Sequence, residues 1–313
     1  MAMEIGKNII RGKIMQIAVV GAGGQGSAHA ACLLKENWDV RVYNRIDEHT
    51  SDGIYDLSVG VKEKIIYLLV SDDVHGEVYE KYIKPYETDE TLIIVAHAYS
   101  LYSKTLLPSS NISVGMIAPR KPGKAVYDAK MGGEKVTAFW DVFQGDCKDT
   151  LMTIASAIGY DLMHVPWAQE CEVDLFLEQF FLPRIILLIE ECYDLLTKKG
   201  ISKEAALYEL YQSGEVGMLL TEASKVGLLE TFVNMASPTC RFGLNESILN
   251  LRKMVPHVNE GTIMMDTLTG IRDGSFFKRL KHDTINEMKF TKTMEKNFLE
   301  QDMSKSSKEL RDD

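Results

Sequence analysis

The first residues able to do chemistry form a glycine-rich turn between an apolar, strand-like run and a helix-like run. The turn reads Gly-Ala-Gly-Gly-Gln-Gly over residues 21–26, which is the order Gly-x-Gly-x-x-Gly. Gly21 permits the tight bend, Gly23 lets the backbone approach a pyrophosphate, and Gly26 lets the helix pack closely on the strand. The N–H groups and dipole of the helix start attract phosphate. We predict a dinucleotide site that comprises Gly21, Gly23, Gly24, Gln25 and Gly26.

The end of the second predicted strand decides between two dinucleotides. An acidic residue there would bind the ribose 2′-hydroxyl of NAD, whereas a basic residue would accept the 2′-phosphate of NADP. Arg45 can make charge-assisted hydrogen bonds to phosphate, while Asp47 and Glu48 would repel it. We predict NADPH, with NADH as the alternative. The residues expected to bind this part of the cofactor are Asn44, Arg45, Thr50 and Ser51.

A pair of carboxylates four residues apart, Asp174 and Glu178, is the second chemical feature. On a helix this spacing places both side chains on one face, about one turn apart. The flanking residues 175–177 and 180–182 are apolar, and carboxylates are costly to bury there unless something neutralises them. A hard cation such as Mg²⁺ would do so. The alternative on spacing alone is an exposed pair, or a salt bridge to Arg184.

Elements that could position these residues differ between the two halves of the chain. Up to residue 165, apolar strand-length runs alternate with helical segments, which predicts a parallel sheet with helices on both faces. The predicted strands are 17–20, 40–43, 65–70, 92–95, 114–118, 136–143 and 160–165, with helices such as 27–36 and 74–84 between them. Later runs show only helical patterns, at 170–198, 203–226, 245–255 and 262–272.

The predicted fold class is therefore α/β, with an N-terminal Rossmann domain followed by an all-helical domain. We place the Rossmann domain at residues 1–165 and the helical domain at residues 166–285. The polar tail, residues 286–313, is expected to fray because it offers little apolar surface to bury.

The composition of the chain limits the kinds of partner that it is expected to bind. The 313 residues carry a net charge of −10, which argues against nucleic acid and anionic membrane surfaces. No apolar run reaches the roughly 18 residues of a membrane span, and residues 1–13 lack the apolar core of a signal peptide. The five cysteines are scattered and odd in number, which favours reduced thiols in a cytoplasmic protein. A small-molecule substrate is expected.

Several motifs, in order from residue 21 to residue 276, resemble those of the ketol-acid reductoisomerases of branched-chain amino-acid synthesis. Asp-Leu-Phe-Leu-Glu-Gln at 174–179 is similar to that family's Asp-Leu-Phe-Gly-Glu-Gln, and Ser-Pro-Thr-Cys at 237–240 to its Ser-Asn-Thr-Ala. The other matches are 21–30 with the phosphate loop, 71–79 with the segment after the fourth strand, 95–97 with Ala-His-Gly, and 118–123 with Ala-Pro-Lys-Gly-Pro-Gly.

The resemblance implies roles for particular residues. Two Mg²⁺ ions would hold an acetohydroxy acid and promote an alkyl migration, and a hydride from the nicotinamide would then reduce the resulting 2-keto acid. Asp174 would bridge the metals and Glu178 would ligate one, while His97 would lie near the nicotinamide and the metal-bound waters. Ser237 would bind the substrate carboxylate, and Arg120 stands in place of the family's lysine. A homodimer or higher homo-oligomer and a knotted helical domain are also implied.

The chain departs from the family where a second acidic pair belongs. Counting back from Ser237 without a gap places Gln212 and Val216 there, and the nearby Glu209 and Glu215 are six residues apart. Six residues correspond to about 600° of helical rotation, so these two side chains point in different directions. Two metals are needed for the migration but not for hydride transfer. Three functions therefore stay open: a full reductoisomerase, a reductase without the migration, and a non-catalytic cofactor-binding scaffold.

Overall fold

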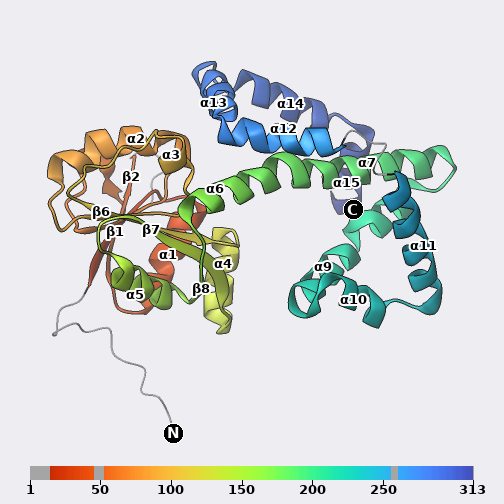
Figure 1. Cartoon of the computed structure of the whole chain (residues 1–313), viewed down its shortest axis with the longest axis horizontal. Helices are drawn as coiled ribbons and strands as arrows, with labels where there is room; N and C mark the ends of the chain where they lie inside the picture. The colour runs from red at the N-terminus through yellow and green to blue at the C-terminus, as the bar shows by residue number, and fades with distance from the viewer. Residues whose placement is uncertain (1–14, 46–52, 255–259, 313) are drawn as a thin grey trace, which may run out of the picture. The chain divides into compact units, whose positions relative to one another are not determined.

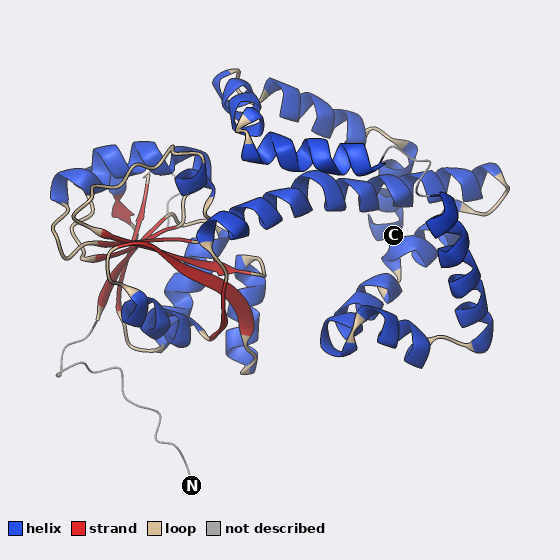
Figure 2. Ribbon diagram, viewed as in Figure 1, coloured by secondary structure: helices blue, strands red, loops and turns tan. Residues whose placement is uncertain are grey.

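The computed structural model describes residues 15–45, 53–254 and 260–312 (Figure 1). The chain divides into two compact units, residues 1–173 and 174–313, and the division falls inside helix α6 (Trp167–Phe176). The first unit contains a sheet covered by helices, and the described part of the second unit is helical (Figure 2). Both findings confirm the predicted fold class. Thr50 and Ser51 lie outside the described residues.

An eight-stranded sheet forms the centre of the first unit, in the order β3-β2-β1-β4-β5-β6-β7-β8. Strands β1 to β6 pair in parallel, so their carboxyl ends meet at one edge. The strands are β1 (Gln16–Val20), β2 (Asp39–Asn44), β3 (Tyr55–Asp56), β4 (Ile65–Leu68), β5 (Leu92–Val95), β6 (Ser113–Pro119), β7 (Val136–Gln144) and β8 (Tyr160–His164).

One pairing differs from the predicted parallel pattern. Strand β7 runs antiparallel to β6, with Ala138 opposite Pro119, the last residue of β6. Strand β7 therefore starts near the carboxyl end of β6. The helix between the two strands does not carry the chain back to the amino end of β6, as it would in a parallel crossover. Strand β8 then pairs in parallel with β7. The short strand β3 lies beyond the predicted set because two residues show no alternation pattern.

Helices cover both faces of the sheet (Figure 1). Helices α1, α4 and α5 lie on one face, and α2 and α3 with short 3₁₀ and π turns lie on the other. Their bounds are α1 (Gly24–Lys35), α2 (His75–Val78), α3 (Tyr99–Tyr102), α4 (Gly123–Gly132) and α5 (Lys148–Ile158). The core between sheet and helices is apolar, and its members include Ile17, Leu33, Ile94, Ile117, Leu151 and Ile154.

A fully buried histidine on α1 joins this helix to the far strand of the sheet. His29 Nδ1 donates to the carbonyl oxygen of Gln25 at 2.7 Å, and its Nε2 accepts from the Tyr160 hydroxyl at 2.6 Å. Because a carbonyl oxygen can only accept, Nδ1 carries the proton of the neutral ring and Nε2 is the acceptor. Burial lowers the pKa of His29 to about 4, against a smaller opposite effect of the hydrogen bond to Gln25.

We predict that this histidine makes the stability of the protein depend on pH. The folded state takes up the proton at a lower pH than the unfolded chain, whose histidine pKa is about 6.5. Unfolding free energy should therefore be highest above pH 6.5 and fall by about 3 kcal/mol as the pH drops to 4. Urea denaturation at several pH values checks this. His29→Gln, which keeps a donor and an acceptor but cannot ionise, should lose that part of the slope; equal slopes in both proteins would contradict the prediction.

Nine α-helices and two π turns are described in the second unit after α6. The helices are α7 (Leu182–Lys198), α8 (Lys203–Leu207), α9 (Glu215–Val226), α10 (Leu228–Met235), α11 (Pro238–Met254), α12 (Glu260–Arg272), α13 (Ser275–Ile285), α14 (Lys289–Leu299) and α15 (Asp302–Asp312). The π turns, which widen the helix by one residue, are η5 (Leu177–Phe181) and η6 (Tyr208–Gln212). The knotted path stays a prediction. Among the described residues no helix is long and apolar enough to cross a membrane, and the five cysteines form no disulfide.

The tail was expected to fray, but the structure differs. Helices α14 and α15 lie in this segment. Helix α15 packs on α7 and α8, where Met303 and Leu310 contact a small apolar core around Tyr193 and Leu207. The Tyr193 hydroxyl donates to Asp302 at 3.0 Å. The amphipathic spacing of a few apolar residues therefore holds a segment whose overall composition is polar.

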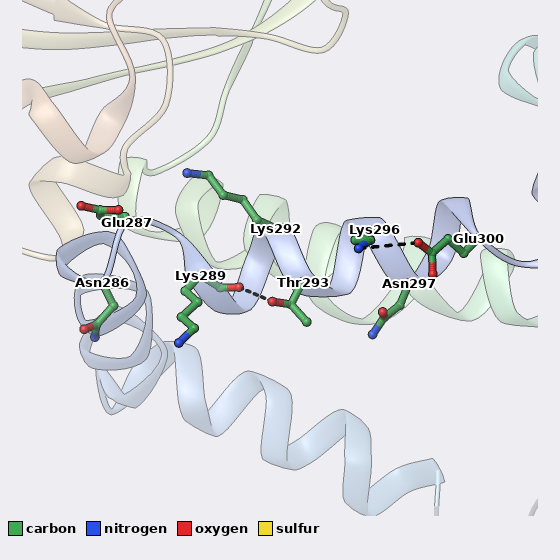
Figure 3. Close-up of a pocket in the computed structure, with 8 residues that line it drawn as sticks. All are labelled: Asn286, Glu287, Lys289, Lys292, Thr293, Lys296, Asn297 and Glu300. Carbon is green, nitrogen blue, oxygen red and sulfur yellow. Dashed lines mark hydrogen bonds and ion pairs between the residues drawn. The ribbon is translucent and has the colours of Figure 1, made fainter.

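Helix α14 and the turn before it line a surface hollow of about 560 Å³ (Figure 3). The side chains around it are polar or charged, and Lys296 lies 3.8 Å from Glu300. They are Asn286, Glu287, Lys289, Lys292, Thr293, Lys296, Asn297 and Glu300. None of the residues predicted for the active site lines this hollow, and a row of lysines balanced by glutamates is typical of a solvated helix face.

Candidate active site

The glycine turn follows β1 and opens α1, as its sequence predicts. Gly21 has a φ of 116°, and a Cβ added there would lie 2.5 Å from the carbonyl oxygen of Leu69. A Cβ on Gly26 would lie 1.8 Å from the carbonyl oxygen of Gly21. Added Cβ atoms on Gly23 and Gly24 would meet nothing within 4 Å. The first two glycines are therefore needed by the fold, and the other two leave space above the helix start for a ligand.

Replacing Gly26 with alanine should disturb both folding and nucleotide binding. The added methyl group cannot share space with the Gly21 carbonyl, so α1 must move away from β1. We expect the unfolding free energy to fall by about 1–3 kcal/mol. Affinity for the dinucleotide should drop at least about tenfold, which corresponds to 1.4 kcal/mol. Denaturation and fluorescence titration with NADPH measure the two effects.

The matched control for this variant is Gly23→Ala, since Gly23 has an ordinary negative φ and open space around it. Its unfolding free energy should change by less than about 0.5 kcal/mol. Equal stability loss in the two variants would show that the close packing of Gly26 is not the cause.

Beside the turn lies a pocket of about 420 Å³, formed entirely within the first unit. Its walls include Gly21 and Gly23 on one side and Asn44 and Arg45 at the end of β2 on another. Acidic side chains face the same space: Asp73 and Glu77. A hydrogen bond from Lys81, its charge and that of Arg45 lower the pKa of Glu77. Asn44 and Arg45 thus line the same pocket as the glycine turn.

A buried carboxylate organises a second polar cluster at the same edge of the sheet. Glu170, on α6, has no exposed surface. Its Oε1 accepts from Arg120 Nη2 at 2.8 Å, and its Oε2 accepts from the backbone N–H of Ala98 at 3.0 Å. The guanidinium of Arg120 also lies 4.6 Å from the ring centre of Phe139. Arg120 directly follows β6, and His97 follows β5, so strand ends deliver both residues to Glu170.

The cluster touches the glycine turn. The carbonyl oxygen of Lys121 accepts from Gln25 Nε2 at 3.4 Å, and a Cβ on Gly123 would lie 2.1 Å from the carbonyl oxygen of Gly24. The loop that begins with Arg120 is therefore packed against the start of α1. This contact brings the polar cluster and the dinucleotide turn into one site.

His97 is held between two carboxylates. Its Nδ1 donates to Asp72 Oδ2 at 3.2 Å, and its Nε2 lies 3.9 Å from Glu170 Oε2. Burial disfavours the charged ring, but the hydrogen bonds with Asp72 and Cys171 and the charge of Glu170 outweigh that effect. The pKa of His97 is raised to about 11.

One group of side chains in the described part of the chain could hold a metal ion at this site. One donor atom from each of His97, Glu170 and Asp174 lies within 4.8 Å of the others. Asp174 is one turn after Glu170 on α6. Glu178, the second predicted ligand, does not belong to this group. It lies in the π turn η5, and its side chain is exposed.

Sequence reasoning missed Asp72 and Glu170. The sequence contains a signal for each of them. Glu170, Asp174 and Glu178 are spaced four apart, so a third carboxylate on the same helix stripe precedes the predicted pair. Asp72 belongs to a segment already matched to the family, directly after β4, where parallel strands deliver side chains to a common edge.

In the second unit, Ser237 precedes α11 and is exposed. Its Oγ accepts from the backbone N–H of Cys240 at 3.2 Å, so the hydroxyl caps the start of that helix. Gln212 Nε2 donates to Ser307 Oγ at 2.9 Å and to the Ser307 carbonyl oxygen at 3.3 Å. Glu209 and Glu215 are exposed.

Two family models match this chain, one over each half. Residues 9–163 match the family described as acetohydroxy acid isomeroreductase, NADPH-binding domain, and residues 167–313 match the ketol-acid reductoisomerase C-terminal domain. Among solved structures, an NADH-preferring ketol-acid reductoisomerase from an uncultured archean has a TM-score of 0.85 at 20% identity, over 95% of this chain and 94% of that one.

Two further structures share less of the fold. A semialdehyde dehydrogenase NAD-binding protein from Cupriavidus necator has a TM-score of 0.61 at 16% identity, over 83% of this chain and 99% of that one. A pyrroline-5-carboxylate reductase from Coxiella burnetii has a TM-score of 0.54 at 18% identity, over 83% and 97%. With both halves matched to one family and a dinucleotide turn in place, the chain belongs to the ketol-acid reductoisomerase family and is an NAD(P)H-dependent oxidoreductase.

Proposed function

We propose that this chain reduces a 2-keto or acetohydroxy acid with NADPH, assisted by a divalent cation, Mg²⁺ by family expectation. The observation that carries the proposal is the cluster of His97, Glu170 and Asp174, because the loop after β6 connects it to the glycine turn. A hydride donor and an electrophilic centre must be neighbours for such a reduction. The proposed site residues are His97, Arg120, Asp174, Glu178 and Ser237, with Glu170 added from the structure.

The donor set fits a divalent cation. Two carboxylates and an imidazole offer the oxygen and nitrogen atoms that such ions take, and three converging donors leave positions for a substrate. When bound, the cation would act as a Lewis acid that polarises the ketone and stabilises the developing alkoxide. Arg120 holds Glu170 in place from the opposite oxygen. Asp72 orients the ring of His97.

A reductase without the alkyl migration is the second candidate, and one observation favours it. At the positions expected for the second acidic pair, Gln212 uses its amide to hold α15, and Val216 carries no ligand atom. A two-metal site places its ions about 3.5–4 Å apart and needs acidic ligands for both. The loss of acidic side chains at these two positions would therefore impair the alkyl migration more than the hydride transfer.

We also propose that the protein works as a homodimer or higher homo-oligomer through its helical unit. Large apolar side chains stand exposed along several of these helices, and Leu188, Leu229 and Val233 are each about 60% exposed. Among the described residues of this unit, few apolar side chains are buried: Leu175, Phe180, Tyr193, Ala206, Leu207 and Ile271. Apolar surface on this scale is typical of an interface. Light scattering after size exclusion should give a mass at least twice that of the 35.2 kDa chain; a monomer at micromolar concentration would overturn the proposal.

One assay separates the functions. The purified protein is incubated with Mg²⁺ and NADPH, and either 2-acetolactate or a simple 2-keto acid is added. Turnover of both substrates, with the dihydroxy acid formed from acetolactate, supports a full reductoisomerase. Reduction of the keto acid alone supports the reductase. The absence of NADPH oxidation with every keto acid tested would refute both and favour a cofactor-binding scaffold.

Arg45 should set the preference for NADPH. The family description names NADPH, whereas the similar archaeal enzyme prefers NADH, so the choice depends on residues of this chain. Replacing Arg45 with aspartate should weaken NADPH binding about 10- to 100-fold, because a charged hydrogen bond contributes about 1.5–3 kcal/mol. NADH binding should hold or improve. Lys198→Ala, an exposed cation of the second unit, is the control. NADH affinity at or above that for NADPH in the unaltered protein would contradict the assignment.

A further inference from the structure

The helical run that follows β4 forms a second wall of the nucleotide pocket. Val74, Glu77 and Val78 line this wall. They are three and four residues apart in one helical run, so their side chains share a face of that run. Two of the three are valines. Glu77 therefore brings a charge to a face that is otherwise apolar.

The charged side chains around the pocket are of both signs. Among the described residues that line it, Arg45 is the only cation, while Asp73 and Glu77 are acidic. A hydrogen bond from Lys81, its charge and that of Arg45 lower the pKa of Glu77, so its carboxylate is ionised at neutral pH. An anion bound beside Arg45 therefore meets an attractive charge and a repulsive one in the same space.

Lys81 offsets the charge of Glu77 from outside the pocket. Its Nζ lies 2.7 Å from Glu77 Oε1, and it is not one of the described residues that line the pocket. The ammonium therefore lies farther from a bound anion than the carboxylate does. Because the energy between two charges falls with distance, Lys81 cancels only part of the repulsion that Glu77 exerts on that anion.

We propose that Glu77 is a specificity-determining residue, whose carboxylate weakens binding of the 2′-phosphate of NADPH and spares the 2′-hydroxyl of NADH, with Lys81 limiting the penalty. The proposal rests on the NADPH preference proposed above and adds a second determinant to Arg45. Repulsion acts between the carboxylate and the charged phosphate and is absent for a neutral hydroxyl. Arg45 favours NADPH, and Glu77 restrains this preference.

The test compares binding of the two dinucleotides without turnover. Fluorescence titration of the full-length protein at low ionic strength gives the dissociation constants of NADPH and NADH. Glu77→Gln should bind NADPH about three- to tenfold more tightly, and Lys81→Gln should bind it more weakly by a similar factor. The double variant keeps the net charge of the pair, so its NADPH affinity should return to within about twofold of the unaltered protein. NADH affinity should stay within about twofold in all three variants.

Glu80→Gln is the matched control. Glu80 pairs with Lys84 at the same sequence spacing and the same 2.7 Å distance, but it does not line the pocket, so NADPH affinity should be unchanged. A salt series separates charge from structure. In about 1 M salt the Debye length is about 3 Å, so the effects of Glu77→Gln and Lys81→Gln should largely disappear.

Two results would overturn the assignment of Glu77: equal changes in the affinities for NADPH and NADH, or changes that persist in high salt. Either would show that the substitution acts on the structure of the pocket. An unaltered protein that binds NADH more tightly than NADPH would instead overturn the preference assigned to Arg45. The ratio of NADPH affinities between Glu77→Gln and the unaltered protein would still decide the role of Glu77.

Discussion

Replacing Asp174 with asparagine should reduce keto-acid-dependent NADPH oxidation by about a thousandfold or more. Asparagine keeps the size and one oxygen but removes the charge that would neutralise the cation. Lewis-acid assistance contributes several kcal/mol to such a reduction, and 4 kcal/mol corresponds to about three powers of ten in rate. Steady-state kinetics at saturating NADPH and metal measure the loss. NADPH affinity should change little, because Asp174 is not among the residues of the nucleotide pocket.

Asp194→Asn is the matched control for this variant. Asp194 is an exposed aspartate on α7 whose carboxylate pairs with Lys198 at 3.2 Å, so the rate of this variant should equal that of the unaltered protein. If Asp174→Asn retained a tenth or more of the activity, the cation would not depend on this carboxylate, and the proposed site would be wrong.

The second large effect is expected on stability. Replacing Arg120 with methionine removes the nearest cation of the buried Glu170, which keeps the backbone N–H of Ala98 and the more distant ring of His97. Breaking a buried ion pair by removing one partner costs about 3–5 kcal/mol. Urea denaturation at pH 7.5 should show a loss of this size, together with loss of the guanidinium contact with Phe139.

A double variant separates charge from packing. Arg120→Met combined with Glu170→Leu removes both charges, and buried pairs replaced by apolar groups are often neutral in stability. The double variant should therefore unfold with a higher free energy than Arg120→Met alone. Arg120→Lys keeps the charge but lacks the planar fork, so it should lose less than the methionine variant. If the unfolding free energy of the double variant were no higher than that of Arg120→Met, the stability loss would come from the packing of Arg120 and not from its charge.

Much of the cofactor domain follows from the sequence because its signals are local. Each buried parallel strand is an apolar run, and the predicted 92–95 coincides with β5 (Leu92–Val95). The glycine turn is equally readable, since Gly21 and Gly26 are fixed by backbone contacts within the same strand–turn–helix unit. The long apolar helices of the second half carry their own periodicity.

What escaped prediction depends on contacts distant in sequence. Glu170 becomes a site residue only when α6 meets the ends of β5 and β6, 72 residues from Ala98 and 50 from Arg120. The direction of β7 depends on the end of the sheet at which the chain leaves α4. The hydrophobic periodicity of a strand gives no information on its direction. The helical tail depends on Tyr193 and Leu207, about a hundred residues earlier, which supply the surface that α15 covers.

The hydrogen bonds between Gln212 and Ser307 limit which side chain position 212 can carry. Glutamate at position 212 would bring a carboxylate toward the Ser307 carbonyl oxygen, which now accepts the Gln212 amide at 3.3 Å. Two acceptors repel each other, so α15 would have to loosen before that oxygen pair could be tolerated. A glutamate at position 212 would thus weaken the attachment of the last helix unless residues in that helix changed with it.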